Sequence, residues 1–258
     1  MSAANPAALC RTPPNTSGMN LTIDIGNTRT KLTLFSQADI VQEFIVPLLT
    51  REVLDGLRAQ YSVQCAIACA VGAIPDALNY LRSVLPTLLL DSQTPLPIKN
   101  CYATPETLGP DRLAVAVAAH ALYPGRNVLV IDCGTAITYE MLTADGRYLG
   151  GAIAPGLRLR YQALHDHTAR LPLLAPQHNV ELLGNTTETC IRAGVQRGAM
   201  AEMDGYIDAM AQEYQGMEII ITGGDAIFFA DKLKNRIFVA PNLLAQGLNC
   251  ILQYNDNQ

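Results

Sequence analysis

The sequence predicts an α/β protein built from two domains of similar topology, each with a mixed β-sheet flanked by helices. Short apolar, β-branched runs alternate along the chain with segments of helical periodicity. A strand ending in Asp, a Gly-containing turn and a returning strand occur at Asp24 and again at Asp132. These aspartates lie 108 residues apart, a domain-sized separation and not the period of a solenoid repeat.

The composition fits this class and argues against several others. The chain has 258 residues, 49% of them hydrophobic, which is enough for a sizeable core. Its formal net charge is −5 and no basic cluster occurs, so we expect no nucleic-acid partner. No run reaches the about 20 apolar residues of a membrane span, so no membrane partner is expected either. Seven cysteines without a CxxC pair indicate free thiols and a cytoplasmic location.

Residues 1–18 are rich in Pro, Ala and Ser and lack the apolar stretch of a signal peptide. We expect a disordered N-terminal extension there, followed by a first domain over residues 19–124 and a second over 125–258.

The first domain opens with a predicted hairpin, residues 21–25 and 31–35, around a Gly-Asn-Thr turn. Apolar spacing then predicts further elements: strands at 39–46 and 64–71, helices at 51–60 and 75–85, and a short strand within 86–90. Four prolines make residues 95–110 loop-like. A helix follows over 111–122, because Pro110 precedes Asp111 and Asp is favoured at or near a helix N-cap.

The second domain repeats the opening. Strands are predicted at 127–132, 139–142 and 148–153, with turns at Gly134 and at Asp145-Gly146. Periodicity then predicts helices at 157–170, 187–213 and 243–253, and a strand at 218–222 that ends in Gly223-Gly224.

The polar residues at both hairpin tips suit a nucleotide's phosphates. Asp24 ends its strand, and a carboxylate there can hold Mg²⁺ through water. Gly26 permits close backbone approach to a phosphate, Asn27 and Thr28 offer donors, and Lys31 adds positive charge. The alternative is an ordinary hairpin with a polar turn.

The second copy shifts the balance toward phosphate binding, because it offers Asp132, Gly134, Thr135 and Thr138 in the same arrangement. The glycines after residue 222 would allow an adenine or ribose to lie flat, although most double glycines are only turns.

An ordered set of motifs resembles one family. It comprises DIGNTRTK, YATPETLGPDRLA, IDCGTAITYE, GGAIAPGL and LGNTTETCIRAG. Together these resemble type III pantothenate kinases, within the acetate kinase, sugar kinase, Hsp70 and actin superfamily. The resemblance implies two ribonuclease-H-like domains with an ATP cleft between them, and transfer of the ATP γ-phosphate to pantothenate, the first step of coenzyme A synthesis.

The resemblance also implies site residues and partners. Asp111 would be the general base, and Asp132 would bind a monovalent cation, K⁺ or NH₄⁺. The implied ATP-binding residues are Asp24, Ile25, Gly26, Asn27, Thr28, Arg29, Thr30, Lys31 and Thr135. The implied pantothenate-binding residues are Tyr102, Gly109, Pro110, Asp111, Arg112 and Thr187. The family is dimeric, so a homodimer using ATP, Mg²⁺ and the cation is expected.

Four of the implied substrate residues also have a purely structural interpretation. Without the resemblance, Asp111 would be interpreted as a helix N-cap and Arg112 as a solvated arginine in the first turn. Tyr102 would be interpreted as a core residue and Thr187 as a helix cap. Two positions depart from the family pattern, Glu140 where Asp is more usual and Ile137 where Thr is usual, and neither is given a role.

Two rival functions fit the same fold. One is a non-enzymatic regulator, which predicts degraded site residues or a basic surface. The other is a kinase for a different small alcohol. The intact motifs and the acidic composition favour the pantothenate kinase.

Overall fold

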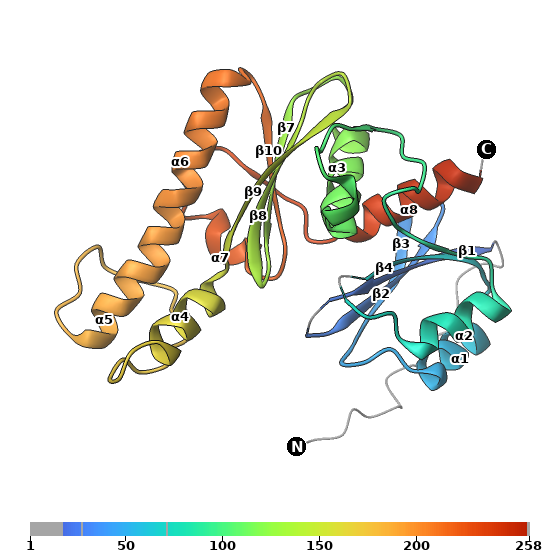
Figure 1. The fold of residues 1–258 in the computed structure, drawn as a ribbon, viewed down its shortest axis with the longest axis horizontal. Helices are drawn as coiled ribbons and strands as arrows, with labels where there is room; N and C mark the ends of the chain where they lie inside the picture. Colours follow the sequence, from blue (N-terminus) through green and yellow to red (C-terminus); the bar gives the residue numbers. More distant parts are fainter. Residues whose placement is uncertain (1–17, 27, 71, 257–258) are drawn as a thin grey trace. The chain divides into compact units, whose positions relative to one another are not determined.

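The computed structural model describes residues 18–26, 28–70 and 72–256. The chain divides into two compact units, Met1–Leu90 and Asp91–Gln258 (Figure 1). Residues 1–17 of the predicted N-terminal extension 1–18 and the site residue Asn27 lie outside the described residues.

The first unit contains a five-stranded mixed sheet of order β3-β2-β1-β4-β5. Neighbours β1, β2 and β3 are antiparallel, whereas β4 runs parallel to both β1 and β5. The strands are β1 (Met19–Ile25), β2 (Thr30–Ser36), β3 (Asp39–Val46), β4 (Val63–Ala70) and β5 (Thr87–Leu89). The helices are α1 (Arg51–Gln60) and α2 (Asp76–Val84), which pack against each other.

Alternation along β1 decides which side chains are buried under these helices. Leu21 and Ile23 join leucines of α1 and α2 in one core. Because neighbouring side chains on a strand point to opposite faces, Asp24 lies on the sheet face away from this core.

The second unit contains a six-stranded sheet of order β11-β10-β7-β8-β9-β6. The strands are β6 (Lys99–Asn100), β7 (Val128–Cys133), β8 (Ala136–Leu142), β9 (Arg147–Pro155), β10 (Glu218–Thr222) and β11 (Phe238–Val239). Strands β7, β8 and β9 are antiparallel neighbours, as β1, β2 and β3 are in the first unit, and β10 runs parallel to β7 as β4 does to β1.

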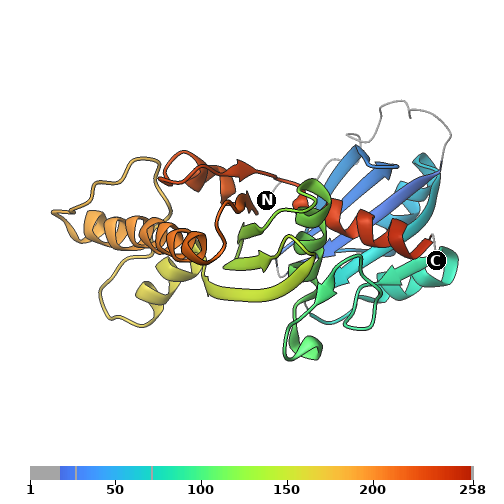
Figure 2. The same ribbon diagram turned by 90° about the horizontal axis from the view of Figure 1, so that it is seen from above.

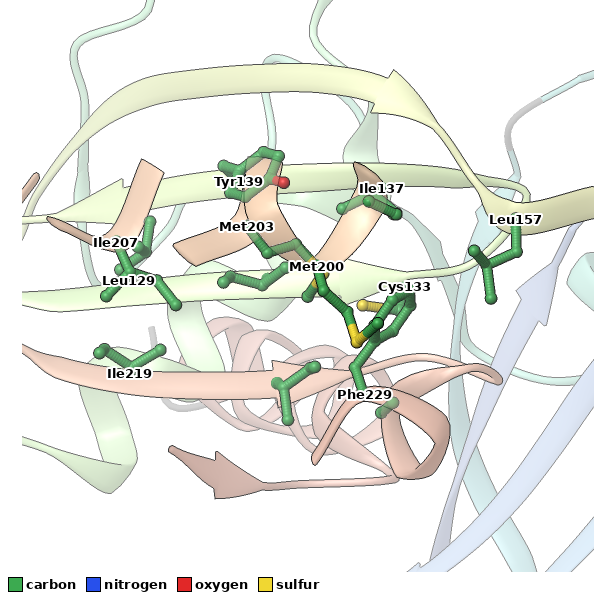
Figure 3. Close-up of a cluster of buried hydrophobic side chains, with 14 of the residues drawn as sticks. Leu129, Cys133, Ile137, Tyr139, Leu157, Met200, Met203, Ile207, Ile219 and Phe229 are labelled. Carbon is green, nitrogen blue, oxygen red and sulfur yellow. The ribbon is translucent and has the colours of Figure 1, made fainter. Parts of the chain in front are cut away.

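The helices of the second unit cover both faces of its sheet. They are η2 (Pro105–Thr107), α3 (Pro110–Leu122), α4 (Leu157–Asp166), α5 (Thr187–Arg192), the π-helical η3 (Ala193–Arg197), α6 (Gly198–Glu213), α7 (Ala226–Ala230) and α8 (Leu243–Asp256). One face of β7 and β8 packs against α4, α6 and α7. Figure 3 shows Cys133, Ile137 and Tyr139 of this face among Met200, Met203 and other apolar side chains.

The opposite face of the second sheet carries α3. This helix contacts β7 and β8 and packs along α8 (Figure 2). Residues 112–119 of α3 are all buried, so α3 is covered on every side, as expected for a helix enclosed between a sheet and another helix.

The predicted fold class is confirmed: both units are mixed sheets with flanking helices in the same strand arrangement. The division at Leu90 comes earlier than the predicted boundary after residue 124. The reason is that β6, inside the proline-rich segment, pairs in parallel with β9, and α3 packs on the second sheet. A nucleotide cleft between the domains stays a prediction.

The helix predicted over 157–170 ends at Asp166, and the helix over 187–213 contains a π-helical turn. Among the elements that the structure describes, the sequence did not predict β6, η2, α7 and β11. In the described part of the chain, no helix is long and apolar enough to cross a membrane.

Candidate active site

The β1–β2 hairpin places its polar residues at one tip of the first sheet. Asp24 pairs with Lys31 and Ile25 with Thr30 in the antiparallel register. The turn is closed by the Gly26 N–H, which donates to the Arg29 carbonyl at 3.2 Å. Gly26, Thr28 and Arg29 are exposed, Asp24 and Lys31 are half-buried and Thr30 is buried. Backbone and side-chain donors with a lysine and an arginine at one exposed turn are a suitable chemistry for phosphate.

The β7–β8 hairpin has the same topology as the β1–β2 hairpin, but different residues neighbour its aspartate. Asp132 pairs with Thr138 on one side and with Thr222 of β10 on the other. Gly134 and Thr135 form the exposed turn, and the Thr135 carbonyl accepts a hydrogen bond from the Gly156 N–H at 3.0 Å.

The backbone of Gly223 lies close to Asp132 and to the backbone of Cys133. Its φ is +91°, and a Cβ there would lie 2.4 Å from Asp132 Oδ1 and 2.5 Å from the Cys133 carbonyl oxygen. The bare glycine therefore leaves a carboxylate and a carbonyl oxygen close together, and hard oxygens of this kind are suitable ligands for a small cation. This fits a site for one monovalent ion.

Cys133 does not share this environment. It is fully buried in the core that packs on α6 and α7 (Figure 3). Burial raises the pKa of its thiol above the usual range, and the charges of Asp132 and Asp225 act in the same direction. The thiol remains protonated at neutral pH, so the structure agrees with a packing role.

The N-terminus of α3 holds four of the six implied substrate residues. Gly109 is the N-cap and Pro110 the first helical residue, so Asp111 is not the cap. Asp111 Oδ1 instead accepts a hydrogen bond from the Arg112 N–H at 3.0 Å, and its side chain is only partly buried. The carboxylate is therefore held at the exposed end of a buried helix.

Arg112 is buried and is not a solvated arginine. Its Nε donates to Glu140 Oε1 at 2.7 Å, and Tyr148 donates from its hydroxyl to Glu140 Oε2 at 2.6 Å. Burial opposes the charge of Arg112, but the bond and charge of Glu140 outweigh it and raise the arginine pKa above its usual value. Burial also raises the pKa of Glu140, against hydrogen bonds from Arg112, Tyr148 and Thr138.

Tyr102 completes this group. Its ring centre lies 5.5 Å from the Arg112 guanidinium carbon, within the range of a cation–π contact, and 6.3 Å from the ring centre of Tyr148. The ring also covers Gly150 on β9, where an added Cβ would lie 3.0 Å from the Tyr102 ring. Tyr102, Asp111 and Arg112 thus form one group with Glu140 and Tyr148.

Thr187 is not part of this group within one chain. It is the first residue of α5, whose cap is Thr186 in a reciprocal arrangement with Thr189. Both views place α5 at the far end of the second unit from α3 (Figures 1 and 2).

Sequence reasoning missed Glu140 and Tyr148. A signal for Glu140 was present: it shares a strand face with Asp132 and Thr138 in an otherwise apolar strand. A carboxylate buried there requires a partner. His165 Nδ1 lies 2.8 Å from the Leu171 carbonyl oxygen, and the described residues contain no group of three or more His, Cys, Asp or Glu side chains that could hold a metal ion.

Comparison with known sequences identifies the family. The family model described as type III pantothenate kinase matches residues 20–209. The chain belongs to the type III pantothenate kinase family. A type III pantothenate kinase of Bacteroides fragilis is 46% identical over 93% of this chain and 100% of its own length.

Solved structures share the fold of this family member. A Baf family protein of Campylobacter jejuni superposes with a TM-score of 0.60 at 20% identity, covering 92% of this chain and all of its own. A ROK family glucokinase of Streptomyces griseus superposes with a TM-score of 0.52 at 14% identity, over 93% of this chain and 100% of its own. At these identities the likeness concerns the fold alone.

Proposed function

We propose that the chain is a pantothenate kinase, which transfers the γ-phosphoryl group of ATP to the hydroxyl of pantothenate and so begins coenzyme A synthesis. Membership of the type III pantothenate kinase family supports the activity. The observation that carries the assignment is the α3 N-terminus, where a partly exposed carboxylate, Asp111, adjoins a buried guanidinium, Arg112.

Asp111 is the proposed general base. Phosphoryl transfer depends mostly on positioning and charge neutralisation, with a proton acceptor for the attacking hydroxyl. One oxygen of Asp111 is fixed by the Arg112 N–H, which orients the other for the pantothenate hydroxyl. Arg112 offers its terminal Nη groups to the pantothenate carboxylate, a pairing that suits the planar guanidinium fork. Gly109 and Pro110 shape the turn that presents both side chains.

The β1–β2 tip is the proposed phosphate site. Gly26, Thr28 and Arg29 are exposed donors there, Lys31 supplies charge and Asp24 would hold Mg²⁺ through water. Ile25 and Thr30 would act through their backbone. Mg²⁺, when bound, neutralises part of the phosphate charge.

Asp132 is the proposed ligand of a monovalent cation, with the Cys133 carbonyl beside it. Thr135, exposed at the same turn, is the proposed nucleotide contact of this hairpin.

We also propose a cytoplasmic homodimer. The distance of Thr187 from the Tyr102 group within one chain supports a second copy as the source of that residue. Exposed apolar side chains of the second unit, among them Ile153, Leu159 and Tyr206, offer surface for association. Sedimentation that gives a monomer at micromolar concentration would contradict the dimer.

The activity is tested by measuring pantothenate-dependent ADP release in wild type and in Asp111→Asn. We expect turnover in wild type and a loss of about 10²–10⁴-fold in kcat in the variant, because the proton acceptor is lost. The KM for ATP should change little. Asp145→Asn, an exposed aspartate of the same unit, is the matched control and should retain wild-type kcat.

Two results would overturn these assignments. Folded wild-type protein that binds ATP but releases no ADP with pantothenate would point to another acceptor alcohol or to a regulator. Wild-type turnover in Asp111→Asn would remove Asp111 as the base.

A further inference from the structure

Glu140 is a buried charge in the middle of a strand. It is 0% exposed and lies on the face of β8 that receives α3. Both of its oxygens are engaged, Oε1 by Arg112 and Oε2 by the hydroxyl of Tyr148. The three side chains come from α3, β8 and β9, so this network joins the helix that carries Asp111 to the two strands beneath it.

The stability of the fold is a weak explanation for this network. Removing two opposite charges from water carries a desolvation penalty that their attraction offsets only with good geometry, and apolar replacements of buried pairs are often neutral or stabilising. A buried ionic network next to the candidate active site is therefore better explained by a role in that site.

We propose that Glu140 is a positioning residue for substrate recognition. It engages the Nε edge of Arg112 and so directs the terminal Nη groups toward the carboxylate of the substrate. Tyr148 fixes the second oxygen of Glu140, and the ring of Tyr102 limits the guanidinium from another side. This inference rests on the proposed function, because it assigns Arg112 to the carboxylate of pantothenate.

The length of the side chain fits this role. The side chain of Glu140 is long enough to bring Oε1 to 2.7 Å from Arg112 Nε. Glu140→Asp would shorten this reach while keeping the charge, so it separates the geometry of the pair from its charge.

The main experiment compares steady-state kinetics of wild type and Glu140→Gln. We expect the KM for pantothenate to rise by about tenfold or more, because a misplaced positioning group strongly weakens a productive complex. The KM for ATP should stay within about twofold. Tyr148→Phe should shift the KM for pantothenate in the same direction by less, and it provides the test if Glu140→Gln does not fold.

Glu202→Gln is the matched control. It breaks another ion pair of the second unit, in which Arg160 Nη2 lies 2.8 Å from Glu202 Oε1. It should change thermal stability without raising the KM for pantothenate relative to that for ATP.

A second readout uses the alcohol analogue of pantothenate, in which CH₂OH replaces the carboxylate. Measured as substrate or competitive inhibitor, the analogue should lose less than about threefold on Glu140→Gln, because it has no charge for Arg112 to bind. Equal losses for pantothenate and the analogue, or equal rises in both KM values, would overturn the positioning role. Absence of pantothenate turnover in wild type would instead overturn the proposed function, so the two failures are distinguishable.

Discussion

The two hairpins β1–β2 and β7–β8 share a topology but differ in charge. In each, an aspartate near the end of the first strand lies opposite a residue of the second strand, and a parallel strand runs alongside. The first tip, DIGNTRTK, contains Arg29 and Lys31, and Asp24 pairs with that lysine. The second, DCGTAIT, has no basic residue, and Asp132 lies between two threonines. The same backbone arrangement thus carries basic side chains at the first tip and none at the second, and this difference underlies the proposed anion and cation sites.

Among the variants that test this comparison, Lys31→Met is expected to have the largest effect, a rise in the KM for ATP. A charge-assisted hydrogen bond contributes about 1.5–3 kcal/mol. Its loss should raise the KM for ATP by roughly ten- to a hundredfold at physiological salt, with a smaller change in the KM for pantothenate. Lys234→Met, which removes an exposed lysine paired with Asp208, is the control. An unchanged KM for ATP would remove Lys31 from the phosphate site.

The next effect concerns the acidic tip. Asp132→Asn should raise the K⁺ concentration for half-maximal activity by about tenfold, because a neutral amide attracts a cation more weakly than a carboxylate does. Assays in K⁺ and in Na⁺ at saturating ATP measure this shift.

The reciprocal variant Asp24→Asn should leave the K⁺ response intact while raising the Mg²⁺ requirement. Identical cation responses in the two variants would show that the hairpins do not differ in the way their charges suggest.

The sequence predicts the hairpins well because their signals are local. An apolar strand leads into a polar turn in both, and the observed strands begin and end within three residues of the predicted ones. The helix at α3 follows equally from Pro110, Asp111 and the small apolar residues after them.

The elements that were missed depend on distant partners. β6 has two residues and exists because Lys99 pairs with Arg147 of β9, and β11 exists through pairing with β10. Similarly, nothing near Arg112 in the sequence reveals Glu140, which is 28 residues away. Local patterns can suggest that a buried carboxylate needs a partner, but only the packing of α3 on β8 identifies it.

Glycine substitutions test the comparison of the two hairpins through their effect on the free energy of unfolding. Gly223→Ala should lower the free energy of unfolding by about 1–3 kcal/mol, because φ is +91° and the new Cβ would meet Asp132 and the backbone of Cys133. Gly26→Ala should have a smaller effect, below about 1 kcal/mol, since its closest contact would be the Arg29 carbonyl at 3.3 Å. Urea denaturation of the two variants measures both losses of unfolding free energy. Equal losses would show that the space between Gly223 and Asp132 is no tighter than the space around Gly26.

The smallest effect on activity is expected from Cys133→Ala. Asp132 and Cys133 are neighbours on β7 and point to opposite faces of the sheet, so the thiol lies in the apolar core and the carboxylate in the candidate cation site. Burial makes the thiol inaccessible for catalysis. Burial also raises the pKa of the thiol, so the group is uncharged at neutral pH. The variant should keep kcat and both KM values within about twofold while losing about 1 kcal/mol of stability from the cavity left by sulfur. A large loss of kcat in a folded Cys133→Ala protein would contradict this separation of the two faces. It would also bring the thiol into the candidate site of the second unit.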